Sequence, residues 1–498
     1  MAERICLAVD VGGTGMKLVT GRYTGTRMEI LDQRTVSVAP VNKNRHVYID
    51  VPGILAQIKS CVKELRQQGI ALQSMGIDTF GNGYGLLDQD LKLMALPYFY
   101  KDSRTKGVLA KMAKWVPLQE QYQSTGIFPT DIRVLSQLYY ESRHSSSLFH
   151  QCRWMLLLPD LLNMQLTGRL QCEISMASVA NLLDKQGEQW NRPLMERLGI
   201  RTDILPPLVQ GGSTAGPLAP PAEKELGGPL WVTTVASHDT ESALLAAPGL
   251  DTDSVFASIG TSLIFGTKTN YPMISPLGYA GAFKTVKGPF SYSLCRDFNA
   301  MWLFEKCMAR WRAENPQLTY QHVTDACTAA EQEARYCNVC DPMLRIEQKD
   351  MLSAIRDYCQ ETGQSPPESL GETANFILDG IVLQALWSFR QVQQITGRCS
   401  YQKLVAIGGG IKNTLLIQRL SDALGLPVVT GSTVSSALGN LMMQLYTTGE
   451  LADYRAIQRM VQNSWTSNVF YPRPEHQDKW EKALLQLSNI DKIRGIWR

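Results

Sequence analysis

Two similar segments, one near the start of each half of the chain, restrict the architecture more than any other feature. Residues 7–21 read LAVDVGGTGMKLVTG, and residues 255–267 read VFASIGTSLIFGT. Each segment has an apolar strand pattern, a turn containing Gly and Thr, and a second apolar strand. The repetition predicts a duplicated architecture in which both halves begin with the same unit.

The rest of the chain alternates strand and helix patterns in both halves, including a long helical stretch over 373–396, which predicts an α/β fold with a cleft between two domains. A chain of 498 residues is too long for one hydrophobic core. We place the domain boundary near residue 250, giving domains over 1–249 and 250–450 and a tail over 451–498 that packs on the second domain. The segment 166–184, LTGRLQCEISMASVANLLD, has two short apolar stretches and is predicted to be a hairpin.

Composition narrows the classes of protein. The formal net charge is only +3, with no long basic block, so nucleic acid is not favoured as a partner. The start of the chain has too short an apolar run for a signal peptide, and no segment predicts a membrane span. Eleven scattered cysteines, with one CxxC pair at Cys337 and Cys340, indicate reduced thiols in the cytoplasm.

The first repeated turn has the residues of a phosphate site. Gly13, Thr14 and Gly15 let backbone N–H groups approach an anion, and Lys17 adds a positive charge. Asp10 ends the strand, where its carboxylate could hold a Mg²⁺ that bridges phosphates. The Walker spacing is absent, and a plain hairpin is the structural alternative.

Two further glycine segments, both in the second half, also suit the binding of phosphate groups. The turn at Gly260 and Thr261 matches the first turn, so the two turns together favour a nucleotide whose phosphates lie between the halves. Residues 406–420, AIGGGIKNTLLIQRL, predict a strand, a glycine triplet with Gly409 at its centre, and a helix capped by Asn413. Close packing of helix on strand is the alternative, and the Rossmann spacing is not met.

A carboxylate stands where the strand pattern of residues 230–236 passes into a helix. Asp239 in VASHDT is placed at the helix N-terminus, where the macrodipole favours its charged form. It could serve only as an N-cap, or it could accept a proton from a substrate as a general base. His238 beside it is a substrate-binding or packed histidine rather than a metal ligand, since no second histidine has metal-pair spacing.

Together these motifs resemble the FGGY family of carbohydrate kinases, which shares two actin-like, ribonuclease H-like ATPase domains with a central cleft. The resemblance spans roughly residues 5–450, and within the family it is greatest to the rhamnulokinases. The segments that carry it are GIDTFG (76–81), YKDSRT (100–105), LLPDLLNMQLTG (157–168), ASHDTESA (236–243), GGGIKNTLLIQ (408–418) and SSALGNLMMQL (435–445).

The resemblance implies a role for each candidate residue. Asp239 would take the proton from a sugar hydroxyl, and Asp10 would hold Mg²⁺. The residues assigned to ATP are Gly13, Thr14, Gly15, Lys17, Thr261, Glu305, Gly409 and Asn413. The residues assigned to the sugar are Gly81, Asn82, His238 and Asp297. The expected reaction is transfer of the γ-phosphate of ATP to a hydroxyl, O1, of a ketose.

Departures from the rhamnulokinase pattern leave the sugar open. The usual Val-Asp-Tyr after GIDTFG is replaced by Asn82, Gly83 and Tyr84, and Asp297 and Glu305 stand at expected Asn and Gln positions. Such changes alter which hydroxyls a site can bind. L-Rhamnulose or a related deoxyketose is expected, with L-fuculose, xylulose, ribulose or a polyol as alternatives. A non-kinase ATPase switch is the distant alternative, and a monomer or homodimer is expected.

Overall fold

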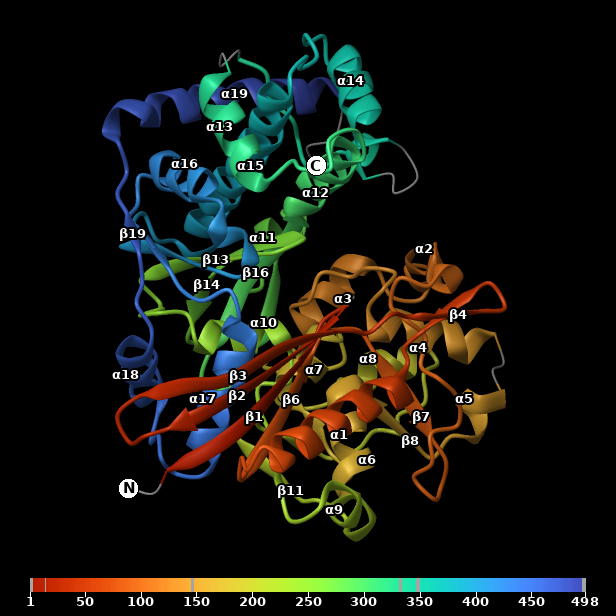
Figure 1. Ribbon diagram of the computed structural model, residues 1–498. Coiled ribbons are helices and arrows are strands. Elements are labelled where there is room, and N and C mark those ends of the chain that lie inside the picture. Colours follow the sequence, from red (N-terminus) through yellow and green to blue (C-terminus); the bar gives the residue numbers. More distant parts are fainter. Residues whose placement is uncertain (1–2, 14, 145–146, 331–333, 346–349, 495–498) are drawn as a thin grey trace.

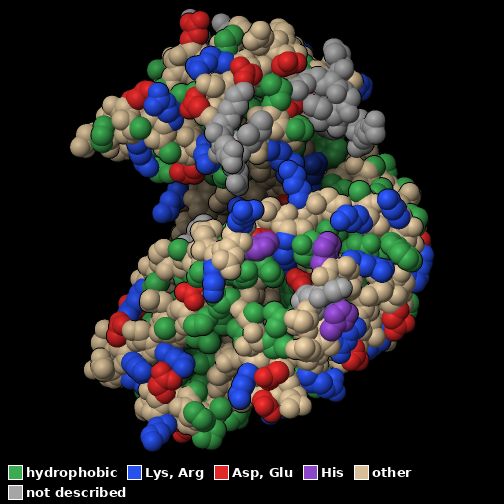
Figure 2. Space-filling model, turned by 90° about the vertical axis from the view of Figure 1, so that its right-hand side faces the viewer, with side chains coloured by type: hydrophobic (Ala, Val, Ile, Leu, Met, Phe, Trp, Pro, Cys, Tyr) green, Lys and Arg blue, Asp and Glu red, His purple; other side chains and the backbone are tan. Residues whose placement is uncertain are grey.

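The computed structural model describes residues 3–13, 15–144, 147–330, 334–345 and 350–494. Two lobes, each built on one large β-sheet, are stacked with a gap between them (Figure 1). The space-filling view shows that this gap is a real hollow, and that Lys and Arg side chains lie along its rim (Figure 2). The predicted two-domain α/β architecture is therefore confirmed.

The first lobe contains a six-stranded sheet in the order β11-β12-β6-β1-β2-β3. Its strands are β1 (Arg4–Val11), β2 (Gly15–Tyr23), β3 (Met28–Ser37), β6 (Ser74–Thr79), β11 (Ser213–Pro217) and β12 (Trp231–Thr234). Short pairs lie outside it: β4 (Val41–Lys43) with β5 (His46–Tyr48), β7 (Tyr84–Leu87) with β8 (Trp154–Leu157), and β9 (Cys172–Glu173) with β10 (Leu208–Val209).

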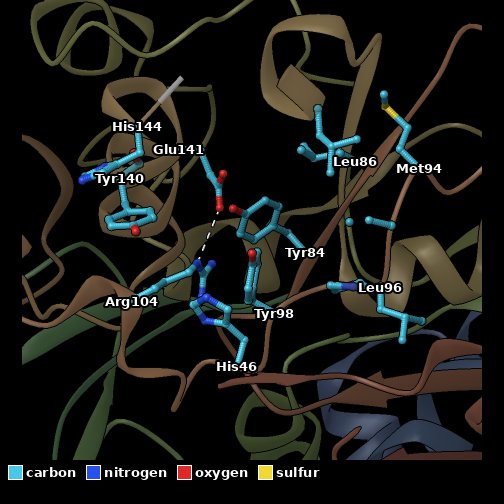
Figure 3. Close-up of a pocket in the computed structure, with 14 residues that line it drawn as sticks. His46, Tyr84, Leu86, Met94, Leu96, Tyr98, Arg104, Tyr140, Glu141 and His144 are labelled. Carbon is cyan, nitrogen blue, oxygen red and sulfur yellow. Dashed lines mark hydrogen bonds and ion pairs between the residues drawn. The ribbon is translucent and has the colours of Figure 1, made fainter. Parts of the chain in front are cut away.

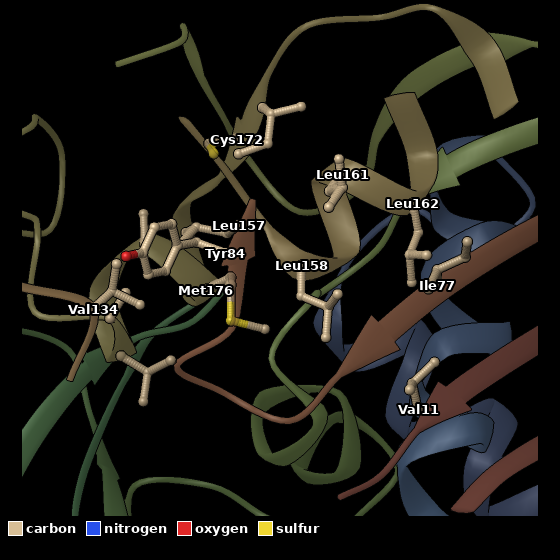
Figure 4. Packing of buried hydrophobic residues seen from close by; sticks show 14 of the residues in the cluster. Val11, Ile77, Tyr84, Val134, Leu157, Leu158, Leu161, Leu162, Cys172 and Met176 are labelled. Atoms are coloured by element: carbon tan, nitrogen blue, oxygen red, sulfur yellow. The ribbon is translucent and has the colours of Figure 1, made fainter. Parts of the chain in front are cut away.

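The first half also contains helices, most of them short. They are α1 (Val51–Gln67), α2 (Val108–Met112), α3 (Leu118–Thr125), α4 (Val134–Arg143), α5 (Ser147–Gln151), α6 (Leu158–Thr167), α7 (Ile174–Val179), α8 (Arg192–Arg197), α9 (Pro220–Leu226) and α10 (Asp239–Leu245). Apolar side chains from β6, β8 and α6 pack together in the core, among them Ile77, Leu157 and Leu161 (Figure 4). The core fixes β1 and β6, the two central strands whose ends carry the candidate site.

The second lobe contains a seven-stranded sheet in the order β15-β16-β14-β13-β17-β18-β19. Its strands are β13 (Ser254–Ile259), β14 (Ser262–Thr269), β15 (Lys284–Lys287), β16 (Tyr292–Asn299), β17 (Lys403–Ile407), β18 (Val428–Thr430) and β19 (Val469–Phe470). In both sheets the strand before the Gly-Thr turn pairs antiparallel with the strand after it and parallel with a later strand. The predicted duplication is confirmed.

Helices of the second half are on the whole longer than those of the first half. They are α11 (Pro276–Ala280), α12 (Met301–Glu314), α13 (Tyr320–Ala329), α14 (Met351–Glu361), α15 (Leu370–Thr396), α16 (Thr414–Leu424), α17 (Ser435–Thr447), α18 (Tyr454–Ser464) and α19 (Gln477–Arg494). The predicted helix over 373–396 corresponds to α15. It begins at a capping box formed by Ser369 and Glu372 and ends at Gly397, whose φ is 68°.

One helix of the second half belongs structurally to the first sheet. α17 packs against β1, β2 and β6 and against α10. A side chain at Gly439 would overlap the carbonyl oxygen of Ser242 in α10, so the glycine permits this close approach. The buried cluster that joins α17 to the first sheet includes Ala8, Val19 and Leu441. The two lobes are therefore joined by a shared layer of helix as well as by the chain near residue 250.

The C-terminal tail packs on both lobes. β19 pairs with β18, and α19 packs against α15 and α16, as expected for a tail on the second lobe. α18, however, packs against β3 of the first sheet, with Ile457 and Met460 in the cluster that contains Tyr23. The expectation that the tail packs on the second half alone is thus corrected for α18.

The predicted hairpin over 166–184 is wrong. The two residues of β9 pair in parallel with β10, and the chain continues directly into α7. The side chain of Glu173 accepts a hydrogen bond from the backbone N–H of Met176 and so caps this helix. Every residue of α7 is buried, so the apolar run lacks the periodicity that separates a helix from a strand.

Candidate active site

The first Gly-Thr turn joins β1 to β2. The N–H of Gly12 donates to the carbonyl of Gly15 at 2.8 Å and closes the turn. Asp10 lies opposite Lys17 in the two strands, and Lys17 Nζ is 3.6 Å from Asp10 Oδ2. Thr14, which was also predicted here, lies outside the described residues. The turn therefore combines a buried carboxylate with a lysine whose side chain is 40% exposed.

The second Gly-Thr turn occupies the same position in the other sheet. The N–H of Gly260 donates to Ser262 O at 2.9 Å, and Thr261 is exposed. The carbonyl of Thr261 accepts hydrogen bonds from the N–H groups of Ala300 and Trp302 at 3.3 and 3.0 Å. The start of α12 is thereby fastened to this turn.

The glycine triplet lies against the second turn, and its three members differ. Gly408 has a φ of 89°, and a Cβ there would lie 2.7 Å from the carbonyl oxygen of Ile259. A Cβ at Gly410 would overlap the side chain of Ile259. A Cβ at Gly409 would meet nothing, and Gly409 is exposed. Two glycines thus serve packing, the alternative predicted from the sequence, whereas Gly409 leaves open surface at the triplet.

Asn413 caps the helix that follows the triplet, as predicted. Its Oδ1 accepts from the N–H of Leu416 at 2.9 Å, at the start of α16.

Asp239 is the first residue of α10, and His238 is its N-cap. Asp239 Oδ1 accepts hydrogen bonds from Thr240 N at 2.6 Å and Thr240 Oγ1 at 3.2 Å, and 31% of the side chain is exposed. Burial and the negative charge of Asp10 raise the pKa of Asp239 to about 7, against the opposing effect of the bonds from Thr240. A carboxyl group with this pKa can accept a proton near neutral pH.

A second buried carboxylate, Asp78, lies beside Asp10. The two residues are paired across β1 and β6, and Asp78 is fully buried. Asn440 of α17 donates to Asp78 Oδ2 at 2.7 Å, whereas Asp78 Oδ1 has no partner. Burial, followed by the charge of Asp10, raises the pKa of Asp78 well above its usual value. Adjacent carboxylates with an unpartnered oxygen are a donor set that suits a hard divalent cation.

The loop after β6 forms the side of the site where an acceptor could lie. A Cβ at Gly81 would lie 3.3 Å from Val179 Cγ1 and 3.8 Å from His238 Cδ2, so Gly81 borders the histidine. Asn82 adopts a left-handed φ of 72°, which asparagine tolerates better than most residues. Its carbonyl accepts from Gln137 Nε2 at 2.8 Å, and its buried Oδ1 has no partner.

A cavity of about 220 Å³ lies behind this loop (Figure 3). Arg104 in its wall donates to Gln137 Oε1 at 2.8 Å and forms an ion pair of 3.5 Å with Glu141. Gln137 thus connects Arg104 to the carbonyl of Asn82. This chain of contacts holds the left-handed residue in place.

His238 is held neutral by its surroundings. Burial, followed by the positive charges of Lys284 and Arg133, lowers the pKa of His238 to about 3 against the charge of Asp297. Its Nε2 is 3.5 Å from Asp239 Oδ1, and its buried Nδ1 has no hydrogen-bond partner. A neutral imidazole can donate with one nitrogen and accept with the other, which suits a hydroxyl ligand.

Comparison with known proteins identifies the family. The model of the FGGY family of carbohydrate kinases, N-terminal domain, matches residues 5–246, and that of the C-terminal domain matches residues 255–448. The chain belongs to the FGGY family of carbohydrate kinases. It is an ATP-dependent sugar kinase, a phosphotransferase with an alcohol group as acceptor, and the family uses a divalent metal. The alternative of an ATPase switch without kinase activity is therefore excluded.

Curated relatives of this FGGY kinase cover nearly its whole length. A rhamnulokinase of Pectobacterium carotovorum subsp. carotovorum (strain PC1) is 32% identical over 482 residues, covering 95% of this chain and 94% of the relative. A rhamnulokinase of Enterococcus faecalis (strain ATCC 700802 / V583) is 30% identical, covering 95% of each.

Solved structures share the fold at lower identity. A ligand-bound xylulose kinase from Lactobacillus acidophilus has a TM-score of 0.83 at 18% identity, covering 98% of each chain. A glycerol kinase from Plasmodium falciparum with ADP has a TM-score of 0.81 at 14% identity, again covering 98% of each. Among the described residues of the FGGY kinase, no helix is long and apolar enough to span a membrane.

Two predicted residues of the kinase lie in contacts that the sequence does not reveal. Asp297 in β16 accepts hydrogen bonds from Lys284 Nζ at 2.7 Å with both oxygens. Burial raises the pKa of Asp297, but Lys284 and Arg133 outweigh it, and the net shift is downward. Glu305 lies in α12, exposed, and accepts from Tyr320 Oη at 2.8 Å rather than contacting either turn through a hydrogen bond.

Sequence reasoning missed other residues of the site in this kinase. Asp78 had a signal, because GIDTFG repeats the apolar–Asp–Gly order of the first turn. Asn299 ends β16 opposite Ser262, beside the second turn. Lys284 and Arg133 carry no local signal, since their importance comes from segments far apart in the sequence.

Proposed function

We propose that this FGGY kinase transfers the γ-phosphoryl group of Mg²⁺–ATP to O1 of a ketose, with L-rhamnulose as the first candidate. The observation that carries the proposal is the position of Asp239, at a helix N-terminus, beside His238 and close enough to Asp10 for the two charges to interact. The identity to rhamnulokinases over 95% of the chain supports the sugar.

Asp239 acts as the base. With a pKa of about 7 it is partly ionised at neutral pH, and it accepts the hydroxyl proton as the acceptor oxygen approaches the γ-phosphorus. The acceptor O–H bond and the bond between the γ-phosphorus and its bridging oxygen break, the new P–O bond forms, and ADP leaves. Because such transition states are loose, alignment of the two substrates contributes more than base strength.

The nucleotide is assigned to the two turns and the glycine triplet. Gly13, Gly15 and Lys17 would contact the phosphates from one lobe, and Thr261 and Gly409 from the other. The open surface at Gly409 supports this assignment, and Thr14, Glu305 and Asn413 remain candidates for ATP contacts. Closure of the lobes on both substrates would exclude water, which competes as phosphoryl acceptor.

Mg²⁺ is assigned to Asp10, with Asp78 as a neighbouring carboxylate. The unpartnered Oδ1 of Asp78 and the raised pKa values of both groups support a cation at this position. Bound Mg²⁺ would neutralise phosphate charge and orient the transferred group.

The sugar is assigned to Gly81, Asn82, His238 and Asp297. The unpartnered Asn82 Oδ1 and His238 Nδ1 support hydroxyl ligands there. L-Fuculose, xylulose, ribulose and polyols stay as alternatives, because Asn82 and Asp297 depart from the rhamnulokinase pattern. We also propose a division into residues 1–249 and 250–450, a cytoplasmic location, and a monomer or homodimer. The eleven cysteines, all free in the structure, support the location.

The test is ADP release with Mg²⁺–ATP against L-rhamnulose, L-fuculose, L- and D-xylulose, L- and D-ribulose and glycerol, for the wild type and Asp239→Asn. We expect sugar-dependent turnover in the wild type and a loss of about 10²–10⁴-fold in the variant, with nucleotide affinity retained. Wild-type turnover in Asp239→Asn would contradict the assignment of the base.

A further inference from the structure

Buried arginines in this protein have carboxylate partners, with one exception. Within the described ranges four arginine side chains are buried: Arg104, Arg133, Arg335 and Arg419. Arg104 is 3.5 Å from Glu141, Arg335 is 3.5 Å from Glu372, and Arg419 is 2.7 Å from Asp379. Among the same described residues, no carboxylate forms an ion pair with Arg133.

Among the described residues, the guanidinium of Arg133 makes one hydrogen bond within the protein. Its Nη1 donates to the carbonyl of Val179 at 3.2 Å, and its buried Nε has no partner. Burying a charged group without a counter-charge costs free energy, and a guanidinium has donors for two parallel hydrogen bonds to a carboxylate. Within the described part of the protein, no carboxylate accepts hydrogen bonds from this guanidinium.

Arg133, the arginine without a carboxylate partner, lies beside the residues assigned to the acceptor sugar. Val179, whose carbonyl accepts from Arg133, also contacts the position of a Cβ at Gly81, and that position is 3.8 Å from His238. Arg133 is close enough to His238 and Asp297 for its charge to act on both. The unpartnered guanidinium therefore borders the residues assigned to the sugar.

The neighbouring charges do not supply the missing partner. Lys284 uses both oxygens of Asp297 at 2.7 Å, so these two charges offset each other. His238 is neutral. Asp239, the carboxylate next to His238 in the chain, is bound to Thr240 and is needed at the reacting hydroxyl. This side of the site thus has one positive charge without a negative counterpart.

We propose that the acceptor sugar carries a carboxylate, and that Arg133 binds it at the end of the molecule remote from the hydroxyl that Asp239 deprotonates. This inference rests on the proposed function: it keeps phosphoryl transfer to a ketose but replaces L-rhamnulose, a neutral sugar, with a keto-sugar acid as the first candidate. The carboxylate takes no part in phosphoryl transfer; it orients the sugar and supplies the counter-charge of Arg133. Neutral ketoses leave that charge unpaired and bind less well.

Matched pairs of sugars test the proposal. D-Fructose is compared with D-fructuronate, and D-tagatose with D-tagaturonate, alongside L-rhamnulose and L-fuculose, by ADP release. We expect kcat/KM to be at least tenfold higher for the acid of a pair than for its neutral partner. Equal values, or a neutral sugar preferred over every acid, would overturn the proposal while leaving the sugar kinase in place.

Variants of Arg133 test whether this residue causes the preference for the acid over the neutral sugar. Arg133→Gln should reduce the acid-to-neutral ratio of kcat/KM at least tenfold, mainly by raising KM for the acid. Arg133→Lys keeps the charge without the fork of donors and should retain part of the ratio. A ratio that is unchanged in Arg133→Gln would place the acid preference elsewhere and overturn the assignment.

Stability distinguishes a ligand-binding arginine from a structural one. In the ligand-free protein, Arg133→Gln should leave the melting temperature unchanged or raise it, because it removes an unpaired buried charge. Arg419→Gln is the matched control and should lower it, since Asp379 would then be buried without a partner. An equal fall in both variants would make Arg133 a structural residue and contradict the proposal.

If the proposed ketose kinase function itself is wrong, the results differ from those that overturn the carboxylate inference alone. If no sugar increased ADP release, the ketose kinase itself would be wrong. Calorimetric binding of D-fructuronate and D-fructose to Asp239→Asn would then measure the acid preference separately. Tighter binding of the acid that disappears in Asp239→Asn combined with Arg133→Gln would support the inference, and equal binding would overturn it.

Discussion

Asp10 and Asp78 lie opposite each other in adjacent parallel strands, and both carboxyl groups are buried. Burial raises the pKa of each, with Lys17 opposing the shift at Asp10 and Asn440 opposing it at Asp78. Two such groups titrate as a pair, and they lose their protons when a cation binds. The pair is therefore a site of stored electrostatic repulsion that binding of a divalent metal would relieve.

Removal of one member of this pair should weaken metal activation. We expect Asp78→Asn to raise the Mg²⁺ concentration needed for half-maximal activity about tenfold or more, because one negative charge next to Asp10 is lost. Titration of activity with Mg²⁺ at fixed ATP measures this. Asp203→Asn, which changes a carboxylate paired with Arg201 on the surface, is the control. An unchanged Mg²⁺ requirement in Asp78→Asn would exclude this carboxylate from the cation site.

The pH dependence should report Asp239 and not the histidine next to it. The base works as the carboxylate, so kcat/KM should fall tenfold per pH unit as the pH drops below about 7, the pKa of Asp239. A limb in this range is usually assigned to histidine, but the pKa of His238 is about 3. The apparent pKa read from this part of the pH profile should change little with temperature, as for a carboxyl group. A large change would point to an imidazole.

The same pKa makes Asp239 a cost to stability. Its folded pKa of about 7 is above the ordinary 3.8, so the folded state binds the proton more tightly than the unfolded state. The penalty is absent below about pH 4, grows as the pH rises, and is complete above about pH 7.

Asp239→Asn should therefore stabilise the ligand-free protein at pH 8, by about 1–3 kcal/mol after allowance for partial exposure. The gain should vanish near pH 4. Thermal unfolding at the two pH values checks this, and a variant less stable than the wild type at pH 8 would contradict the raised pKa.

Adjacent glycines in the triplet should respond differently to alanine. Gly410→Ala would force a methyl group into Ile259 and should lower the free energy of unfolding by about 1–3 kcal/mol. Gly409→Ala meets nothing and should fold normally, but its methyl group would occupy surface assigned to ATP and raise KM for ATP. Urea unfolding and KM for ATP, measured on both variants, separate the two effects. Loss of stability in Gly409→Ala would refute the distinction.

Contact between α10 and α17 should matter to catalysis at a distance. Gly439→Ala would push against the carbonyl of Ser242 and so displace α10, which begins with Asp239. We expect kcat to fall at least tenfold with a smaller change in KM for ATP. Ser436→Ala, half-buried in the same helix, is the control. Normal kcat in a folded Gly439→Ala protein would show that α10 is not positioned by this contact.

Local patterns in the sequence predicted the parts of the fold that local physics determines. The strand–turn–strand units, the helix α15 and the cap at Asn413 each depend on neighbours within a few residues. The segment that forms α7 was misjudged because all its residues are buried, which removes the periodicity. Arg133, Lys284 and Asn440 could not be placed, since each depends on contacts between segments separated by tens to hundreds of residues.

The packing of α17 on the first sheet has a consequence for biosynthesis. β1 and β6 leave the ribosome early, but the helix that covers them, residues 435–447, follows only after residues 80–434 have been made. At about 5–20 residues per second this delay is tens of seconds. During that time the apolar face that later receives Leu438 and Leu441 has no covering layer from its own chain. The first half alone lacks this covering helix, so we expect a separately expressed fragment of it to be poorly folded.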